Sequence, residues 1–231
     1  MQMITAKSSK VVSLDLGVGK GLVIVAHPDD ETIWMGGTIL MNPKIKWTVF
    51  SLCRGDDLDR APKFKKVCGL YGAKAIISDL EDEGIMSIRE SEPEIERRTK
   101  EVLRPLDEPR ASKVQDVEVP RYFDYIFTHG ANGEYGHPRH KGVYRAIRNL
   151  VSSNWLKVEK TFMFWYKLGD NGDVVAPRNN NDDDKRRKVF CVRLPADILK
   201  KKRDVIERIY GFKRNSFEYR NCGGEESFKI L

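Results

Sequence analysis

Short apolar runs alternate along the chain with segments of helical periodicity. The apolar runs are rich in Val, Ile, Phe, Tyr and Trp, a composition typical of β-strands. They cover residues 22–26, 46–52, 75–77, 122–128 and 161–165. We therefore predict five strands, the first of which reads as buried because all five of its residues are apolar.

The segments between the strands predict helices. Apolar residues recur at three- and four-residue spacing over 58–71, 143–151 and 198–210, and Gly211 is placed to end the last of these helices. An alternation of strands and helices indicates a mainly parallel, doubly wound sheet with helices on both faces. The fold class predicted from the pattern is therefore α/β.

Two stretches lack this periodicity. Residues 107–121 predict a loop, and residues 170–188, which are rich in Gly, Asn and Asp, are too polar to offset the entropy lost on ordering. We expect a mobile surface loop at 170–188. The length of 231 residues fits one domain, which we place at 21–231 after an N-terminal extension at 1–20.

Composition narrows the class of protein. The net charge is +7, from 41 basic and 34 acidic residues, and the only dense basic runs, 185–188 and 200–203, read as solvated surface, so no nucleic-acid partner is expected. No apolar stretch is long enough to span a membrane, and residues 1–20 lack the apolar core of a secretory signal. The four cysteines show no C-x-x-C pairing, which favours reduced thiols. We therefore expect a cytoplasmic protein and leave homo-oligomerisation open.

The first candidate for chemistry is the segment His27-Pro28-Asp29-Asp30-Glu31, directly after the first predicted strand. Pro28 biases His27 to an extended conformation, so the strand ends there and a helix can follow. Open α/β sheets build their sites at the carboxyl ends of strands. Glu31 is either a further ligand or a carboxylate favoured by the helix dipole, and we prefer the second reading.

The second candidate is the pair His137 and His140, spaced i, i+3 at the start of the predicted helix over 143–151. Together with His27 they account for three of the four histidines in the chain. Such a concentration beside carboxylates indicates a metal or proton-transfer site. The fourth, His129, follows the predicted strand at 122–128 and reads as a core residue or a supporting one.

Two motifs carry a resemblance to a known family. The segments Ala26-His27-Pro28-Asp29-Asp30-Glu31 and Gly133-Glu134-Tyr135-Gly136-His137-Pro138-Arg139-His140 resemble those of the PIG-L/LmbE-like zinc-dependent de-N-acetylases. These enzymes remove acetyl groups from molecules that contain N-acetylglucosamine. Weaker similarity extends over most of the chain from about residue 20. The resemblance implies a Rossmann-like fold and a small-molecule substrate, an N-acetylated amino-sugar conjugate.

The resemblance also implies the roles of individual residues. One Zn²⁺ per chain would be held by His27, Asp30 and His140, which matches the three protein ligands and open position of a catalytic zinc site. Asp29 would be the general base. His137 would stabilise the oxyanion and protonate the departing amine.

Substrate contacts are less clear from the sequence. Arg54, at the end of the second predicted strand, resembles a family position that contacts substrate, although a surface ion pair would explain it equally well. Asn132 and Glu134 flank the glycine turn before His137 and are candidate ligand contacts. Arg139 departs from the family, in which most members carry aspartate. An arginine whose side chain approaches His137 would disfavour the imidazolium.

Other readings of the same residues stay open at this point. Histidines and aspartates also build the two-metal sites of phosphoesterases, although the sequence offers no second ligand set. A non-catalytic sugar- or anion-binding module is the other alternative. We predict a zinc-dependent amidohydrolase that releases acetate from an N-acetylglucosaminyl compound.

Overall fold

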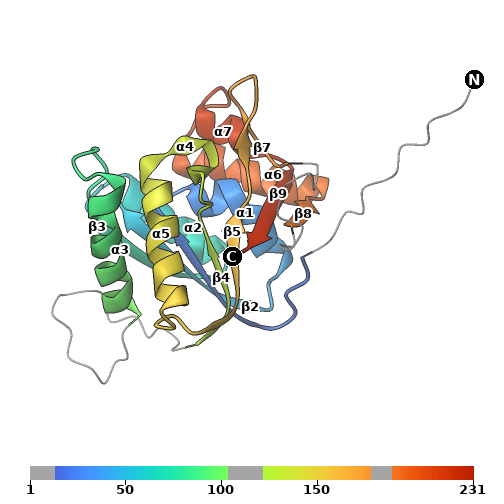
Figure 1. The fold of residues 1–231 in the computed structure, drawn as a ribbon. Helices are drawn as coiled ribbons and strands as arrows, with labels where there is room; N and C mark the ends of the chain where they lie inside the picture. The colour runs from blue at the N-terminus through green and yellow to red at the C-terminus, as the bar shows by residue number, and fades with distance from the viewer. Residues whose placement is uncertain (1–13, 104–121, 178–188) are drawn as a thin grey trace, which may run out of the picture.

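The central sheet orders the whole molecule (Figure 1). The computed structural model describes residues 14–103, 122–177 and 189–231, which contribute seven strands to this sheet. Across the sheet they are β3 (Lys74–Leu80), β2 (Ile45–Cys53), β1 (Gly19–Val25), β4 (Phe123–Thr128), β5 (Val158–Phe164), β9 (Glu225–Ile230) and β8 (Val189–Arg193). Neighbouring strands from β3 to β5 pair in parallel, whereas β9 pairs antiparallel with both β5 and β8.

The mainly parallel α/β fold predicted from the sequence is thus confirmed. All five predicted strands are present, but β3 continues to Leu80, three residues beyond its predicted end. Strands β8 and β9 were not predicted. Glu226, Ser227 and Lys229 are buried polar residues of β9, so this strand lacks the apolar run that marked the others.

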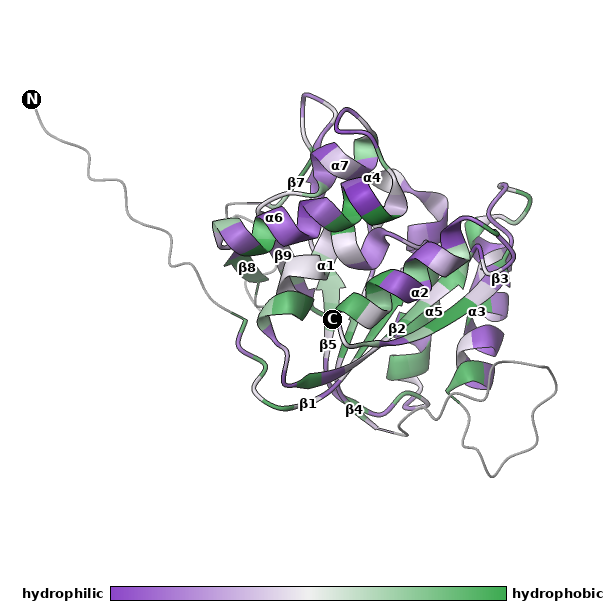
Figure 2. Ribbon diagram, turned by 180° about the vertical axis from the view of Figure 1, so that it is seen from behind, coloured by the Kyte–Doolittle hydropathy of each residue, from purple (hydrophilic) through white to green (hydrophobic). Residues whose placement is uncertain are grey.

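Helices cover both faces of the sheet, and Figure 2 shows the apolar strands between them. The helices are α1 (Asp30–Met41), α2 (Arg60–Leu70), α3 (Ile88–Val102), α4 (Gly133–Gly136), α5 (Pro138–Ser152), α6 (Ala196–Asp204), the π-helical turn η1 (Val205–Tyr210) and α7 (Phe217–Asn221). The helices α1, α2 and η1 supply one apolar core, and α3 and α5 supply the other.

Strand β1 shows why this layering forms. Its residues alternate between the two cores, with Val23 and Val25 in one and Leu22 and Ile24 in the other, and all four are fully buried. A strand that is apolar on both faces is stable only between two layers of helices. The unbroken apolar run in the sequence is therefore the direct cause of the three-layer architecture.

The predicted loops and the predicted N-terminal extension can be compared with the structure only in part. The described part of the predicted loop at 170–188 forms a hairpin, in which β6 (Lys167–Leu168) pairs with β7 (Val174–Val175) around a turn that contains Gly172 at a φ of 79°. Residues 107–121, 178–188 and the basic run within them lie outside the described residues. Leu14 and Leu16, in the predicted extension, are buried in the core, and β1 begins at Gly19.

Two further expectations concern composition. All four cysteines are present as thiols. Over the described ranges, no helix combines the length and apolarity needed to cross a bilayer.

A buried carboxylate, Glu226, connects the last strand to helices α1 and α6. Glu226 accepts hydrogen bonds from the backbone N–H groups of Gly37 and Thr38 in α1, at 2.8 and 2.7 Å. Its other partners are the hydroxyl of Thr38 at 2.7 Å and the ammonium of Lys202 at 2.8 Å. The side chains of Lys202 and Glu226 are fully buried, so the solvated surface expected for residues 200–203 is wrong for Lys202. Gly37 also lies directly against the side chain of Leu194, where a larger residue would not fit.

We predict that Lys202→Met lowers the free energy of unfolding by about 3–5 kcal/mol, because it leaves the Glu226 carboxylate buried without its cation. Lys200 is the matched control, since its side chain is 73% exposed and pairs with Asp204 on the surface. Lys200→Met should cost at most about 1 kcal/mol. Urea unfolding of both variants measures the difference, and equal losses would contradict the prediction.

Candidate active site

The candidate site lies at the carboxyl ends of β1 and β4. The chain leaves β1 toward β2 on one side, while β4 and β5 continue the sheet on the other. In open α/β sheets this change of direction opens a crevice beside the strand ends. His27 follows β1 and His129 follows β4, so the order of the strands alone brings their loops together.

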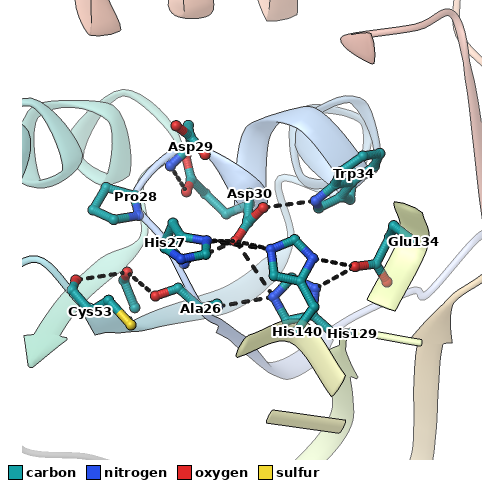
Figure 3. A network of polar contacts seen from close by, with 12 residues as sticks. Ala26, His27, Pro28, Asp29, Asp30, Trp34, Cys53, His129, Glu134 and His140 are labelled. Carbon is teal, nitrogen blue, oxygen red and sulfur yellow. Dashed lines mark hydrogen bonds and ion pairs between the residues drawn. The ribbon is translucent and has the colours of Figure 1, made fainter. Parts of the chain in front are cut away.

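The three predicted metal ligands converge on one point (Figure 3). Nδ1 of His27 lies 3.2 Å from Oδ2 of Asp30 and 3.3 Å from Nε2 of His140, and the third side of the triangle, from His140 to Asp30, measures 3.4 Å. Tetrahedral zinc with bonds of about 2.0–2.1 Å to N and O ligands would separate them by about 3.3 Å. The triangle therefore fits such an ion.

A carboxylate stands behind each histidine of this triangle. Nδ1 of His140 lies 2.6 Å from Glu134, and Nε2 of His27 lies 2.8 Å from Asp82. Histidines that bind metals usually donate their other ring N–H to such a group, which fixes the tautomer and the ring orientation. Asp82 was missed at the sequence level because β3 was predicted to end at Ile77. A run of three acidic residues, 81–83, directly after the true strand end at Leu80 was the available signal.

His129 supports the site from below. The backbone N–H of Ala26 donates to Nε2 of its ring at 2.9 Å, and Nδ1 lies 2.8 Å from Glu134. The ring also stacks on His140 with centroids 3.8 Å apart. Both ring nitrogens of His129 therefore have partners within the protein, and the ring holds Glu134 and His140 in place.

Glu134 does not lie where the substrate contact predicted from the sequence would place it. Its side chain is fully buried and accepts a hydrogen bond from the N–H of Gly130 in addition to its contacts with the two histidines. The residue has a φ of 57°, and this turn directs the carboxylate inward. Figure 3 shows it beside His129 and His140. Glu134 therefore lies behind the histidines, and the substrate contact expected from the sequence does not fit this position.

Asp29 and Asp30 are adjacent, yet their environments differ. Burial resists ionisation of Asp30, but His140 and His129 hold its pKa well below the usual value. Burial and the charge on Asp30 raise the pKa of Asp29 well above its usual value, against the opposing effect of Arg60 at 2.8 Å. Two carboxyl groups with opposite shifts are suited to different roles, one as a ligand and one as a proton acceptor.

The open side of the site is a crevice of about 210 Å³. Arg54 lines it, as predicted, and donates to Asp82 at 3.0 Å. Asn132 does not line the crevice. Its amide donates to the carbonyl of Tyr166 at 2.7 Å, and the residue lines a separate cavity of about 1260 Å³ between β6, β7 and β9. The remaining side chains around the crevice include Ile33, Trp34, Tyr135, Phe217 and Glu218.

His137 also faces the crevice, from the N-cap of α5. Burial and the neighbouring rings of His140 and His27 lower the pKa of His137 to about 3. Arg139 follows two residues later, but its guanidinium is buried and donates to Glu81 at 3.0 Å. The residue that departs from the family motif is thus engaged with the loop that follows β3.

Solved structures with this fold include two deacetylases and one hydratase. The A40926 pseudoaglycone deacetylase Dbv21 superposes with a TM-score of 0.60 at 14% identity, covering 91% of this chain and 96% of its own. The N,N'-diacetylchitobiose deacetylase from Pyrococcus horikoshii gives 0.58 at 17% identity, with 92% and 83% covered. The 4-carboxy-2-hydroxymuconate hydratase GalB from Pseudomonas putida gives 0.51 at 12% identity, with 88% and 82% covered. These similarities establish the fold, and the hydratase shows that the fold alone does not fix the reaction.

The sequence itself supplies the stronger comparison. The family model described as GlcNAc-PI de-N-acetylase, PIG-L, matches residues 22–151, which is more than half of the chain. That range contains the triangle of candidate ligands, both carboxylates behind it, and Asp29 and His137 at the crevice. The chain belongs to the PIG-L family.

Proposed function

We propose that this protein is a zinc-dependent de-N-acetylase, which hydrolyses the acetamide of an N-acetylglucosamine-containing small molecule to acetate and a free amine. The observation that carries the proposal is the triangle of His27, Asp30 and His140 with the unligated Asp29 beside it. An amide hydrolase of this kind needs a place for a Lewis acid and a separate proton acceptor. The family match supports the same reaction class.

One zinc ion per chain would be held by His27, Asp30 and His140. When bound, it would polarise the acetamide carbonyl and lower the pKa of a water toward about 7. Asp82 and Glu134 would keep the two imidazole rings oriented.

Asp29 would accept the proton of the attacking water. Its raised pKa is suited to this task, since a weakly basic carboxylate would take the proton poorly. Arg60 would hold the carboxylate in place through its contact at 2.8 Å.

His137 would face the other side of the attacked carbonyl. From its position on the crevice the neutral ring would donate a hydrogen bond to the developing oxyanion. Because the pKa of His137 is lowered to about 3, the ring carries no second proton near pH 7, and the role of proton donor expected from the sequence does not fit it. Asp29 would instead pass the proton that it takes from the water to the departing amine.

The sugar would be held by polar groups at the mouth of the crevice. Arg54, whose side chain is 48% exposed, pairs there with the mostly buried Asp82, and such donors and acceptors suit sugar hydroxyls. Two of the structural neighbours are described as deacetylases of a pseudoaglycone and of a diacetylated disaccharide, which agrees with an acetylated amino sugar as the substrate class.

The function is tested by incubating the zinc-loaded protein with a panel of N-acetylglucosaminides and measuring acetate and free amine. Parallel assays measure phosphate release from phosphoesters and hydration of an unsaturated dicarboxylate. We expect equal amounts of acetate and amine and no product in the other two assays. Product in either of those assays alone, without acetate, overturns the proposal.

We predict that the purified protein binds one zinc ion per chain and that chelation abolishes turnover, which added zinc restores. His140→Ala should lose the metal because it removes one corner of the triangle. Lys141→Ala, at the neighbouring position, is the control and should retain it. Elemental analysis after gel filtration measures both, and full activity without any transition metal would sink the prediction.

Asp29→Asn should lower kcat by about 10²–10⁴-fold, the usual contribution of a general base, while zinc content stays near one per chain. The amide keeps the size of the side chain but cannot take the proton. Asp30→Ala should instead lose the metal. If Asp29→Asn lost zinc and Asp30→Ala kept it, the two roles would be exchanged.

A further inference from the structure

Asp29 has an unusual backbone conformation. Its φ is 120° and its ψ is −28°, although it carries a side chain. Backbone in a sparsely populated region is strained and persists only where the surroundings hold it. The proposed general base is therefore kept in place by contacts that offset this strain.

The carbonyl of Asp29 accepts the N–H groups of Thr32 and Ile33 at 2.9 and 2.8 Å, as at the start of any helix, whereas its own N–H is held by the side chain of Glu31. The N–H of Asp29 donates to Oε2 of Glu31 at 3.0 Å. This bond fixes the peptide that precedes Asp29, and with it the direction in which the side chain leaves the backbone. Without an acceptor the N–H would be buried and unpaired, which is costly.

Glu31 is itself fully buried, and its pKa is raised by that burial. Its second oxygen, Oε1, accepts hydrogen bonds from the hydroxyl of Thr32 at 2.6 Å and from the phenol of Tyr210 at 2.9 Å. The helix dipole alone does not explain a carboxylate at this depth, because a buried charge needs hydrogen-bond donors. Those donors orient the carboxylate so that Oε2 faces Asp29.

Tyr210 reaches Glu31 from the end of the π-helical turn η1. Single π-helical turns are rare and occur often near functional sites, because they change the direction of the side chains that follow. Gly211 ends the turn in a left-handed conformation with a φ of 84°. Lys63 fixes the same end by donating to the carbonyl of Tyr210 at 2.9 Å.

We infer that Glu31 and Tyr210 are positioning residues for Asp29. They hold its backbone in the strained conformation and so keep its carboxylate beside the metal ligands without joining them. The inference rests on the proposed function, in which Asp29 takes the proton of the attacking water.

Tyr210→Phe tests the inference because it removes one hydroxyl and little volume. We expect kcat to fall about tenfold, with KM and zinc content unchanged, since a base displaced by a fraction of an ångström loses its alignment. Tyr71→Phe is the matched control: the Tyr71 hydroxyl is also buried and contacts Thr32 at 2.9 Å, but it makes no hydrogen bond to Glu31. Its kcat should stay within about twofold.

Glu31 variants give a graded second test. Gln can still accept the N–H of Asp29 and reorganise its contacts with the hydroxyls, so Glu31→Gln should retain most of the activity. Glu31→Met removes the acceptor and should lower kcat by about 100-fold at unchanged zinc content. A crystal structure of Glu31→Met should show Asp29 relaxed from a φ of 120°. If this variant does not fold, Tyr210→Phe and Glu31→Gln decide the question.

A purely structural role is the competing outcome. A structural role would lower the melting temperature of Tyr210→Phe and leave its kcat unchanged, and this result overturns the inference. A folded Glu31→Met variant in which Asp29 keeps its strained φ also overturns it. The parent function is tested separately by Asp29→Asn. If that variant is fully active, the proposed mechanism fails; if it is inactive while Tyr210→Phe is normal, only the positioning role fails.

Discussion

Compensation of buried negative charge is the constraint on which this molecule depends. Asp30, Glu31 and Glu134 are at most 3% exposed, and removing a carboxylate from water is costly unless it is paired and hydrogen-bonded. Each of the three has partners: histidines and an indole for Asp30, hydroxyls and an amide for Glu31, and two histidines for Glu134. The positions of these partners, more than the open crevice, define the site.

The sequence predicted those features correctly in which a residue pattern is compatible with only one structural environment. Apolar runs such as the one before His27 must lie between helices, and a histidine after such a run must lie at a strand end. These two facts place His27 and Asp30 at the carboxyl edge of a mainly parallel sheet. The fold class could therefore be predicted without coordinates, whereas the grouping of His27, Asp30 and His140 was expected from the resemblance of two motifs to a known family.

Other features depended on distances that the sequence does not contain. Asp82 and Glu134 are both acidic residues near a strand end, yet one faces the open crevice and the other lies behind the histidines. The difference arises from a left-handed turn at Glu134 and from three extra residues in β3. Likewise, the contact between Tyr210 and Glu31 spans 179 positions and leaves no local pattern.

The hydrogen bonds between Glu226 and α1 bear on the order in which contacts form during folding. All three triangle residues lie between positions 27 and 140, so they are synthesised early, but Glu226 contacts Gly37 across 189 positions of sequence. Contacts of such separation form late, because a long loop must first close. During synthesis the nascent chain thus holds every candidate ligand well before Glu226, which binds the helix that begins at Asp30, has been added.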